Sequence, residues 1–150
     1  MTLLFVPLDR AGLAAWAGSG RLAPVVGFAP TPAFRGAFGF GPDDDETADY
    51  TVLCVAGVSC LTMHPARLVA VAEADVPAGD DEFGRVSLPS LSYAAVTALF
   101  AEGSARMAER THAAVAGVGL DEAWDDARVE TLLAEGDLLW HGPTEWGTLV

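Results

Sequence analysis

Lysine is absent from this sequence. All eight basic residues are arginine, against 21 aspartate and glutamate residues, and the formal net charge is −13 over 150 residues. Nucleic-acid binding depends on Lys and Arg side chains that displace counterions from phosphates, and anionic bilayers attract proteins through the same cationic groups. We therefore expect a protein that binds neither nucleic acid nor a membrane surface.

Long apolar runs and cysteines are also scarce. No apolar stretch approaches the ~18 residues that span a bilayer, and Met1–Leu8 lacks the basic segment of a secretory signal before it meets Asp9. The only cysteines, Cys54 and Cys60, lie in one predicted helix at a spacing that turns them to different faces, so they cannot bridge within it. Free thiols without an export signal predict a cytoplasmic protein.

The hydrophobic content is sufficient for a folded core. Hydrophobic residues make up 51% of the chain, which excludes overall disorder and predicts one domain over residues 1–150. The apolar runs at Thr2–Pro7 and Arg67–Ala74 predict strands, and the second is continuously apolar from Leu68 to Ala72, as in a central strand buried on both faces. Another strand is expected at Leu138–Trp140.

Capping residues and apolar periodicity predict the helices. The longest should run from Asp45 to Met63, because Asp43–Glu46 suits a helix start and an apolar face follows from Tyr50 to Leu61. The segment Leu91–Phe100 is ambiguous between helix and strand. The remaining helices are expected at residues 9–17, 104–115 and 122–135, with a short one opened by Thr31-Pro32.

Five segments of the chain carry a family resemblance: LLFVPLDRAGLAAW, FAPTPAFR, DDETADYTVLCVAGVSCLTM, ARLVAVAEADVP and LLAEGDLLWHGPTEW. Together they resemble a family of small actinobacterial proteins known only as a domain of unknown function. Two departures are His141, where an aromatic residue is expected, and the glycine-rich stretch Gly36–Gly41. The resemblance implies a single α+β domain, favours a strand over Tyr93–Phe100, and carries no activity and no site residues.

The fold that follows is a single α+β domain with a small mixed sheet of about four strands, covered by about four helices. The helix at residues 45–63 should be the most buried of these. The four strands are expected at Thr2–Pro7, Arg67–Ala74, Tyr93–Phe100 and Leu138–His141.

No motif predicts a metal or cofactor. The three histidines, His64, His112 and His141, lie on separate elements without a zinc-binding spacing. Cys60 and His64 could supply two ligands from one helix face, but a buried cysteine and a helix-terminal histidine are the simpler interpretation. We expect no cofactor.

Two clusters remain as candidate sites. Arg35 follows Thr31-Pro32 among aromatic residues, where it could bind a carboxylate or phosphate, although pairing with Asp45 or Asp49 is the simpler interpretation. One hypothesis is therefore an enzyme or ligand-binding domain with a site near Arg35, Tyr50 and His141.

The second cluster lies in the C-terminal segment. Trp140 should complete the core, while Trp146, with Glu145, lies at the surface or partly covered and could contact a partner. The favoured hypothesis is a small non-enzymatic cytoplasmic protein that binds another protein or self-associates.

Overall fold

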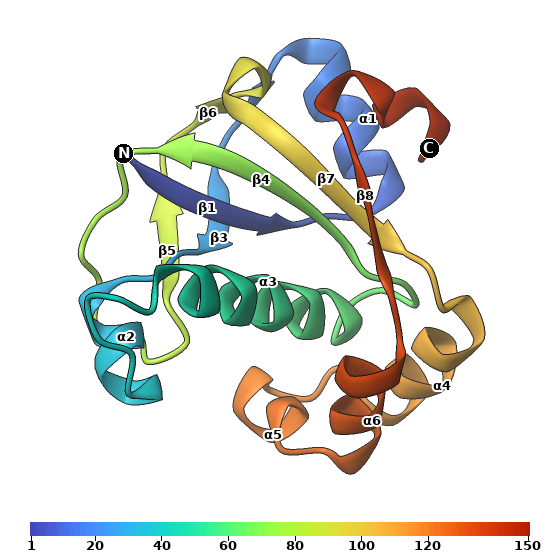
Figure 1. Ribbon diagram of the computed structural model, residues 1–150. Coiled ribbons are helices and arrows are strands. Elements are labelled where there is room, and N and C mark those ends of the chain that lie inside the picture. The colour runs from blue at the N-terminus through green and yellow to red at the C-terminus, as the bar shows by residue number, and fades with distance from the viewer.

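Six strands form one antiparallel sheet in the computed structural model, which describes residues 1–150 (Figure 1). The strand order is β5-β3-β1-β4-β7-β8, and every neighbouring pair is antiparallel. The strands are β1 (Thr2–Pro7), β3 (Val25–Phe28), β4 (Leu68–Ala74), β5 (Arg85–Leu88), β7 (Val96–Glu102) and β8 (Leu138–His141).

Six α-helices and two 3-10 turns complete the fold, with a small ladder of β2 (Arg21–Leu22) and β6 (Leu91–Ser92) at one end. The helices are α1 (Arg10–Ser19), α2 (Pro32–Phe38), α3 (Asp45–Leu61), α4 (Ala105–Val115), α5 (Leu120–Trp124) and α6 (Ala127–Glu135). The 3-10 turns are η1 (Tyr93–Ala95) and η2 (Pro143–Thr148).

The α+β class is confirmed, but the expected sheet was wrong in size and type. It has six main strands instead of about four, is antiparallel instead of mixed, and six α-helices replace about four. The missed strands β3 and β5 are four residues each, too short for alternation to stand out. Strand direction depends on which distant segments pair, which local periodicity does not encode.

Two other expectations changed in detail. Residues 91–100 form β6, the η1 turn and most of β7, so the strand interpretation holds except at Tyr93–Ala95. The helix expected at residues 122–135 is two helices, because the Asp126 side chain accepts a hydrogen bond from Arg128 N and caps α6 separately. The short helix opened by Thr31-Pro32 is α2, with Thr31 as its N-cap.

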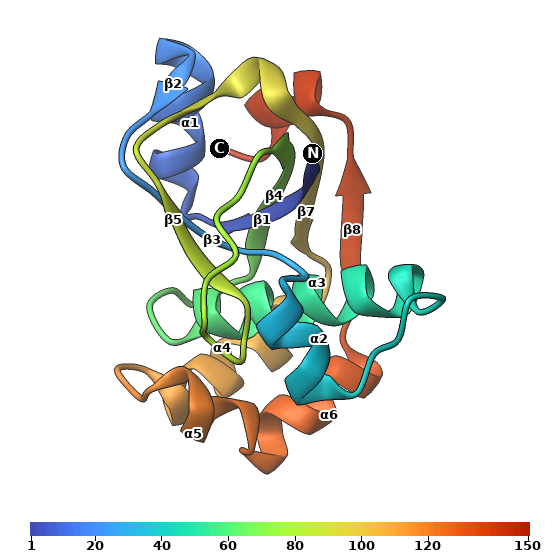
Figure 2. The same ribbon diagram turned by 90° about the vertical axis from the view of Figure 1, so that its left-hand side faces the viewer.

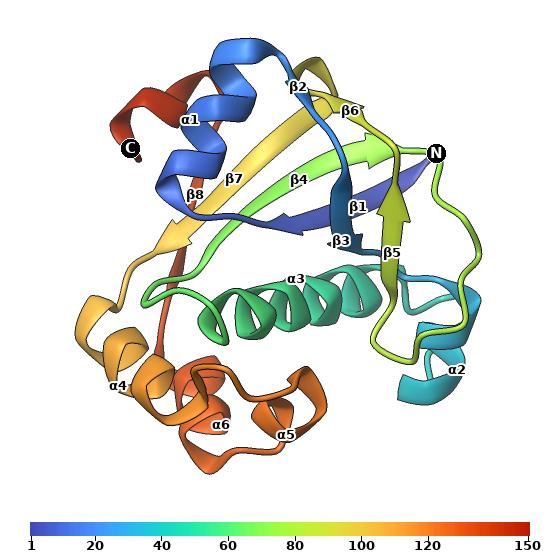
Figure 3. The same cartoon turned by 180° about the vertical axis from the view of Figure 1, so that it is seen from behind.

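Helix α3 lies between the sheet on one side and α4, α5 and α6 on the other (Figure 1). It is therefore buried on more than one side, as the sequence predicted, with Val52, Val55 and Ala56 fully enclosed. Tyr50, which we expected on its apolar face, is instead exposed. The opposite face of the sheet is covered by α1 and η2, as Figure 3 shows from behind.

Strand alternation divides the core into two clusters. Phe5, Val69 and Val71 face α3, while Leu4 and Val6 face α1 with its buried Trp16. This is the alternation of a sheet covered on both faces, and it confirms β4 as an internal strand.

Candidate functional site

Strand β8 forms an open edge of the sheet. It pairs with β7 alone, and its two central side chains, Leu139 and Trp140, are 50% and 62% exposed. Figure 2 shows β8 as the outermost strand on its side of the molecule. Two large exposed apolar side chains on an unpaired strand edge are typical of a surface that a partner covers.

The sequence-based prediction that Trp140 is buried was wrong. Trp140 lies opposite Phe100 of β7 and so points to the α3 side of the sheet. Helix α3 packs over β1, β3 and β4 and leaves the outer strand uncovered. The strand at Leu138–His141 was correctly expected, but its position at the edge depends on the order of strands in space.

The free side of β8 also presents backbone hydrogen-bonding groups. Asp137 O accepts a hydrogen bond from Gly103 N at 2.9 Å, so Asp137 directs its backbone toward the neighbouring strand. This orientation alternates along an antiparallel pair. The register of β8 on β7 therefore turns the N–H and C=O groups of Leu138 and Trp140 outward.

A carboxylate lies at the Trp140 end of this edge. Gly142 N donates a hydrogen bond to Glu145 Oε2 at 2.5 Å. Cη2 of Trp140 lies 3.8 Å from the place where a Cβ on Gly142 would stand. The Glu145 carboxylate and the Trp140 indole are therefore neighbours across Gly142.

Trp146 contributes to the fold rather than to the open edge. It is half-buried and packs with Leu149 against the core cluster on the α1 face. The expectation that Trp146 lies at the surface or partly covered is confirmed. Trp140 therefore exposes more of its indole than Trp146 does.

A loop covers the Arg85 end of the opposite edge of the sheet. The loop that follows β4 runs beside β5 (Figure 2), where a Cβ on Gly79 would lie 3.5 Å from Val86 Cγ1. Asp81 of this loop accepts a hydrogen bond from Arg85 N at 3.0 Å, and the Arg85 guanidinium lies over the Phe28 ring. The two edges of the sheet thus differ, because the loop after β4 covers the Arg85 end of β5, whereas β8 pairs with β7 alone.

Arg35 pairs with a helix-start acid, the simpler of the two interpretations that the sequence allowed. Its Nη2 forms an ion pair with Asp45, and its Nη1 donates to Gly41 O at 3.0 Å. Tyr50 is exposed on α3, and His141 lies on β8 opposite Leu99.

A hollow of about 340 Å³ lies beside Arg35. The acids Asp45, Asp49 and Glu73 line it, whereas Tyr50 and His141 do not. Burial, and secondly the nearby Asp45, raise the pKa of the Asp49 carboxyl above its ordinary value.

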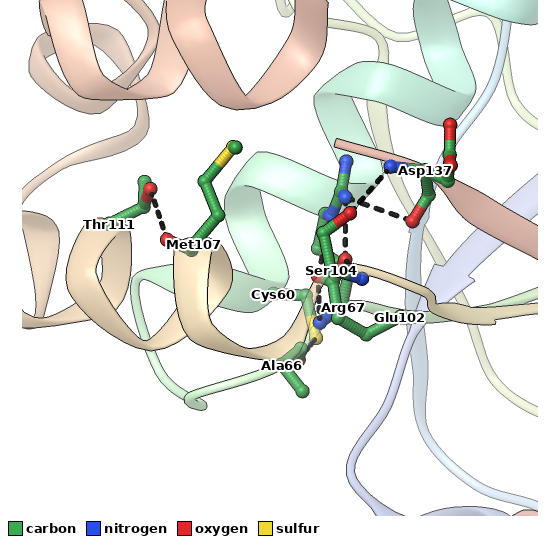
Figure 4. A network of polar contacts seen from close by, with 8 residues as sticks. All are labelled: Cys60, Ala66, Arg67, Glu102, Ser104, Met107, Thr111 and Asp137. Atoms are coloured by element: carbon green, nitrogen blue, oxygen red, sulfur yellow. Dashed lines mark hydrogen bonds and ion pairs between the residues drawn. The ribbon is translucent and has the colours of Figure 1, made fainter. Parts of the chain in front are cut away.

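A larger hollow of about 680 Å³ lies between the starts of α1 and α4, the turn after α3 and the C-terminal residues. Its wall contains the buried ion pair of Arg67 and Glu102 (Figure 4). Arg67 also donates to Asp137 O at 3.3 Å, and Glu102 accepts from Ser104 N at 3.2 Å. Nε and Nη2 of Arg67 and both carboxylate oxygens of Glu102 are thus used within the chain.

The cysteines and histidines form no metal site. No group of three or more His, Cys, Asp or Glu side chains is placed to hold an ion. Cys60 is fully buried and its Sγ donates to Leu8 O and Ala66 O, while His112 Nδ1 contacts Leu61 O at 2.6 Å. Cys54 is also unlinked, as the sequence predicted.

The exposure of Leu139 and Trp140 could not be predicted from the sequence. The Lys or Arg that usually protects an edge strand is absent after Arg128, so no local signal marks β8 as an edge.

A family model described as "Family of unknown function (DUF6912)" matches residues 2–150, and the chain belongs to this family. Comparison with curated proteins and with solved structures gave no match. None of the helices combines the length and apolar character required to cross a bilayer.

Proposed function

We propose that this member of a family of unknown function is a non-enzymatic module that binds another protein along β8. The observation that carries the proposal is the contrast between the two sheet edges. The loop after β4 covers the Arg85 end of the β5 edge, whereas β8 exposes Leu139, Trp140 and outward backbone groups. Exposed aromatic residues such as Trp dominate the energetics of many protein interfaces.

The proposed surface includes the residues that the sequence suggested for partner binding. Glu145 lies at the end of this edge, and Trp146 fixes the η2 turn on the core behind it. We also propose a cytoplasmic location, where the thiols of Cys54 and Cys60 would stay reduced. The charge of −13 supports the expectation that the partner is not a nucleic acid.

The alternative is an enzyme or ligand-binding domain with a site near Arg35, Tyr50 and His141. Its support is the hollow beside Arg35, but the guanidinium there is paired with Asp45 and the other two side chains do not line the hollow. An active site needs polar groups from separate segments that converge on one cavity. The geometry therefore favours the binding module.

Two experiments test the proposal. Cross-linking in extracts of the native organism captures the partner, and nuclear magnetic resonance of the isotope-labelled chain then maps where the purified partner binds. The wild-type chain should capture a protein that the Trp140→Ser variant loses. The control variant Met63→Ser removes another exposed apolar side chain, which lies just after the C-terminal end of α3. This variant should still capture the partner.

The captured protein, once purified, should shift the backbone amide signals of residues 138–146. Shifts confined to other surfaces, or equal capture by the two variants, would contradict the proposal. If the chain instead captures a second copy of itself through β8, the protein self-associates and the proposal of a separate partner is wrong.

A further inference from the structure

We propose that β8 binds an extended, basic segment of a partner protein, which adds to the sheet as a further strand. This inference rests on the proposed function and names the chemistry of the partner. It follows from the charges at the two ends of β8 and from the backbone groups between them.

Both ends of β8 carry a carboxylate that has no cationic partner in the chain. Asp137 precedes the strand and Glu145 folds back onto Gly142 after it, and neither forms an ion pair. The nearest basic residue in the sequence is Arg128, and none follows it. Both carboxylates are therefore available to a cation from a partner.

The Trp140 end suits a guanidinium or ammonium group in particular. The exposed indole and the Glu145 carboxylate are neighbours across Gly142. A cation placed between them would contact the indole ring and the carboxylate together, and both interactions favour Arg or Lys.

The backbone of β8 requires that the partner segment be extended. The outward N–H and C=O groups of Leu138 and Trp140 match the hydrogen-bonding period of an added strand. At ~3.3 Å per residue, the distance from Asp137 to Gly142 is about 16 Å. A fitting segment therefore carries basic residues on both sides of a short stretch of β-forming residues.

A second copy of this chain fits this edge poorly. Each copy carries a net charge of −13, and the β8 region of a second copy would bring no basic residue to Asp137 or Glu145. Like charges at an interface oppose association, most strongly at low ionic strength.

The test uses isotope-labelled protein and three synthetic peptides. The first carries arginine residues on both sides of a short valine stretch, the second replaces each arginine by glutamate, and the third is the arginine peptide with alternate backbone nitrogens methylated. The first peptide should shift the amide signals of residues 138–142, and the glutamate peptide should not bind. The methylated peptide keeps the charge but cannot form a strand, so its affinity should fall by about tenfold or more.

Matched variants separate the edge from the general charge of the protein. Trp140→Ser and Glu145→Gln should each weaken binding of the arginine peptide by about tenfold, whereas Met63→Ser should leave it unchanged. Equal binding of the methylated peptide, or shifts spread over the whole acidic surface, would overturn the inference.

The basic-strand inference and the proposed function can fail independently of each other. A natural partner that requires Trp140, combined with no binding of the arginine peptide, would leave the proposed function intact and overturn the basic-strand inference. Sedimentation that shows a dimer abolished by Trp140→Ser would also overturn it in favour of a second copy.

Discussion

The Arg67 guanidinium and the Glu102 carboxylate form a buried, bidentate ion pair (Figure 4). The Nε–Oε1 distance is 2.7 Å and the Nη2–Oε2 distance is 2.6 Å. Their side chains are 3% and 5% exposed. The pair joins the start of β4 to the end of β7, and Arg67 Nη2 also reaches Asp137 O ahead of β8. It therefore ties the open edge strand to the centre of the sheet.

Removing one member of this pair should be strongly destabilising. Glu102→Gln leaves the buried Arg67 charge without its counterion and should lower the free energy of unfolding by about 3–5 kcal/mol. Urea unfolding measures this directly. The double variant Arg67→Met with Glu102→Leu should lose less than the single variant, since no unpaired charge remains. A single-variant loss below about 1 kcal/mol would contradict the burial of the pair.

Core and edge residues should respond differently to truncation. Leu61 is fully buried in the cluster under α3, and Leu61→Ala should cost about 2–5 kcal/mol of unfolding free energy. Trp140→Ala, at an exposed position, should change it by only about 0.5 kcal/mol. Thermal and urea unfolding of both variants check the contrast. Equal losses would mean that Trp140 is part of the core after all.

Gly84 should not tolerate a side chain. Its φ is +80°, and a Cβ there would lie 2.2 Å from the backbone oxygen of Ala29. Gly84→Ala must therefore displace the start of β5 and should cost more than the ~1 kcal/mol of backbone strain alone. Gly36→Ala is the matched control, because a Cβ on Gly36 meets nothing within 4 Å, and it should stabilise α2 by up to about 1 kcal/mol. A similar effect at both positions on chemical unfolding would refute this local geometry.

Stability should fall above about pH 9 because of Cys60. Burial raises the pKa of this thiol from 9.0 to about 11. The unfolded chain then loses the Cys60 proton at lower pH than the folded chain. The associated stability is fully present below pH 9 and is lost as the pH rises toward about 11.

The loss should be on the order of 2–3 kcal/mol for a pKa difference of this size, and urea unfolding at a series of pH values measures it. A Cys60→Ala variant is the control for other titrating groups and should show a shallower decline. Parallel curves for the two proteins would contradict the assignment to Cys60.

Local patterns were sufficient for much of the fold. The apolar run at Leu68–Ala72 identified an internal strand, Thr31-Pro32 identified the start of α2, and the acids after Pro42 marked the start of α3. Each of these features depends on residues close together in the chain, so capping, propensity and periodicity were enough to predict it.

The candidate site could be predicted only in part. The sequence indicated a strand at Leu138–His141 and an Asp45 partner for Arg35, and both are present. It did not indicate that Arg67 pairs with Glu102, since these residues are 35 positions apart and belong to different strands.

The sequence alone determined the acidic surface, the α+β class and the apolar character of the last strand. The position of this strand at the edge and of Trp140 outside the core follows from how the whole molecule packs. Apolar character specifies which side chains gain from burial, whereas the packing of distant elements decides which of them are covered. Helix α3 packs over β1, β3 and β4 but does not extend over β8. This placement leaves Leu139 and Trp140 exposed.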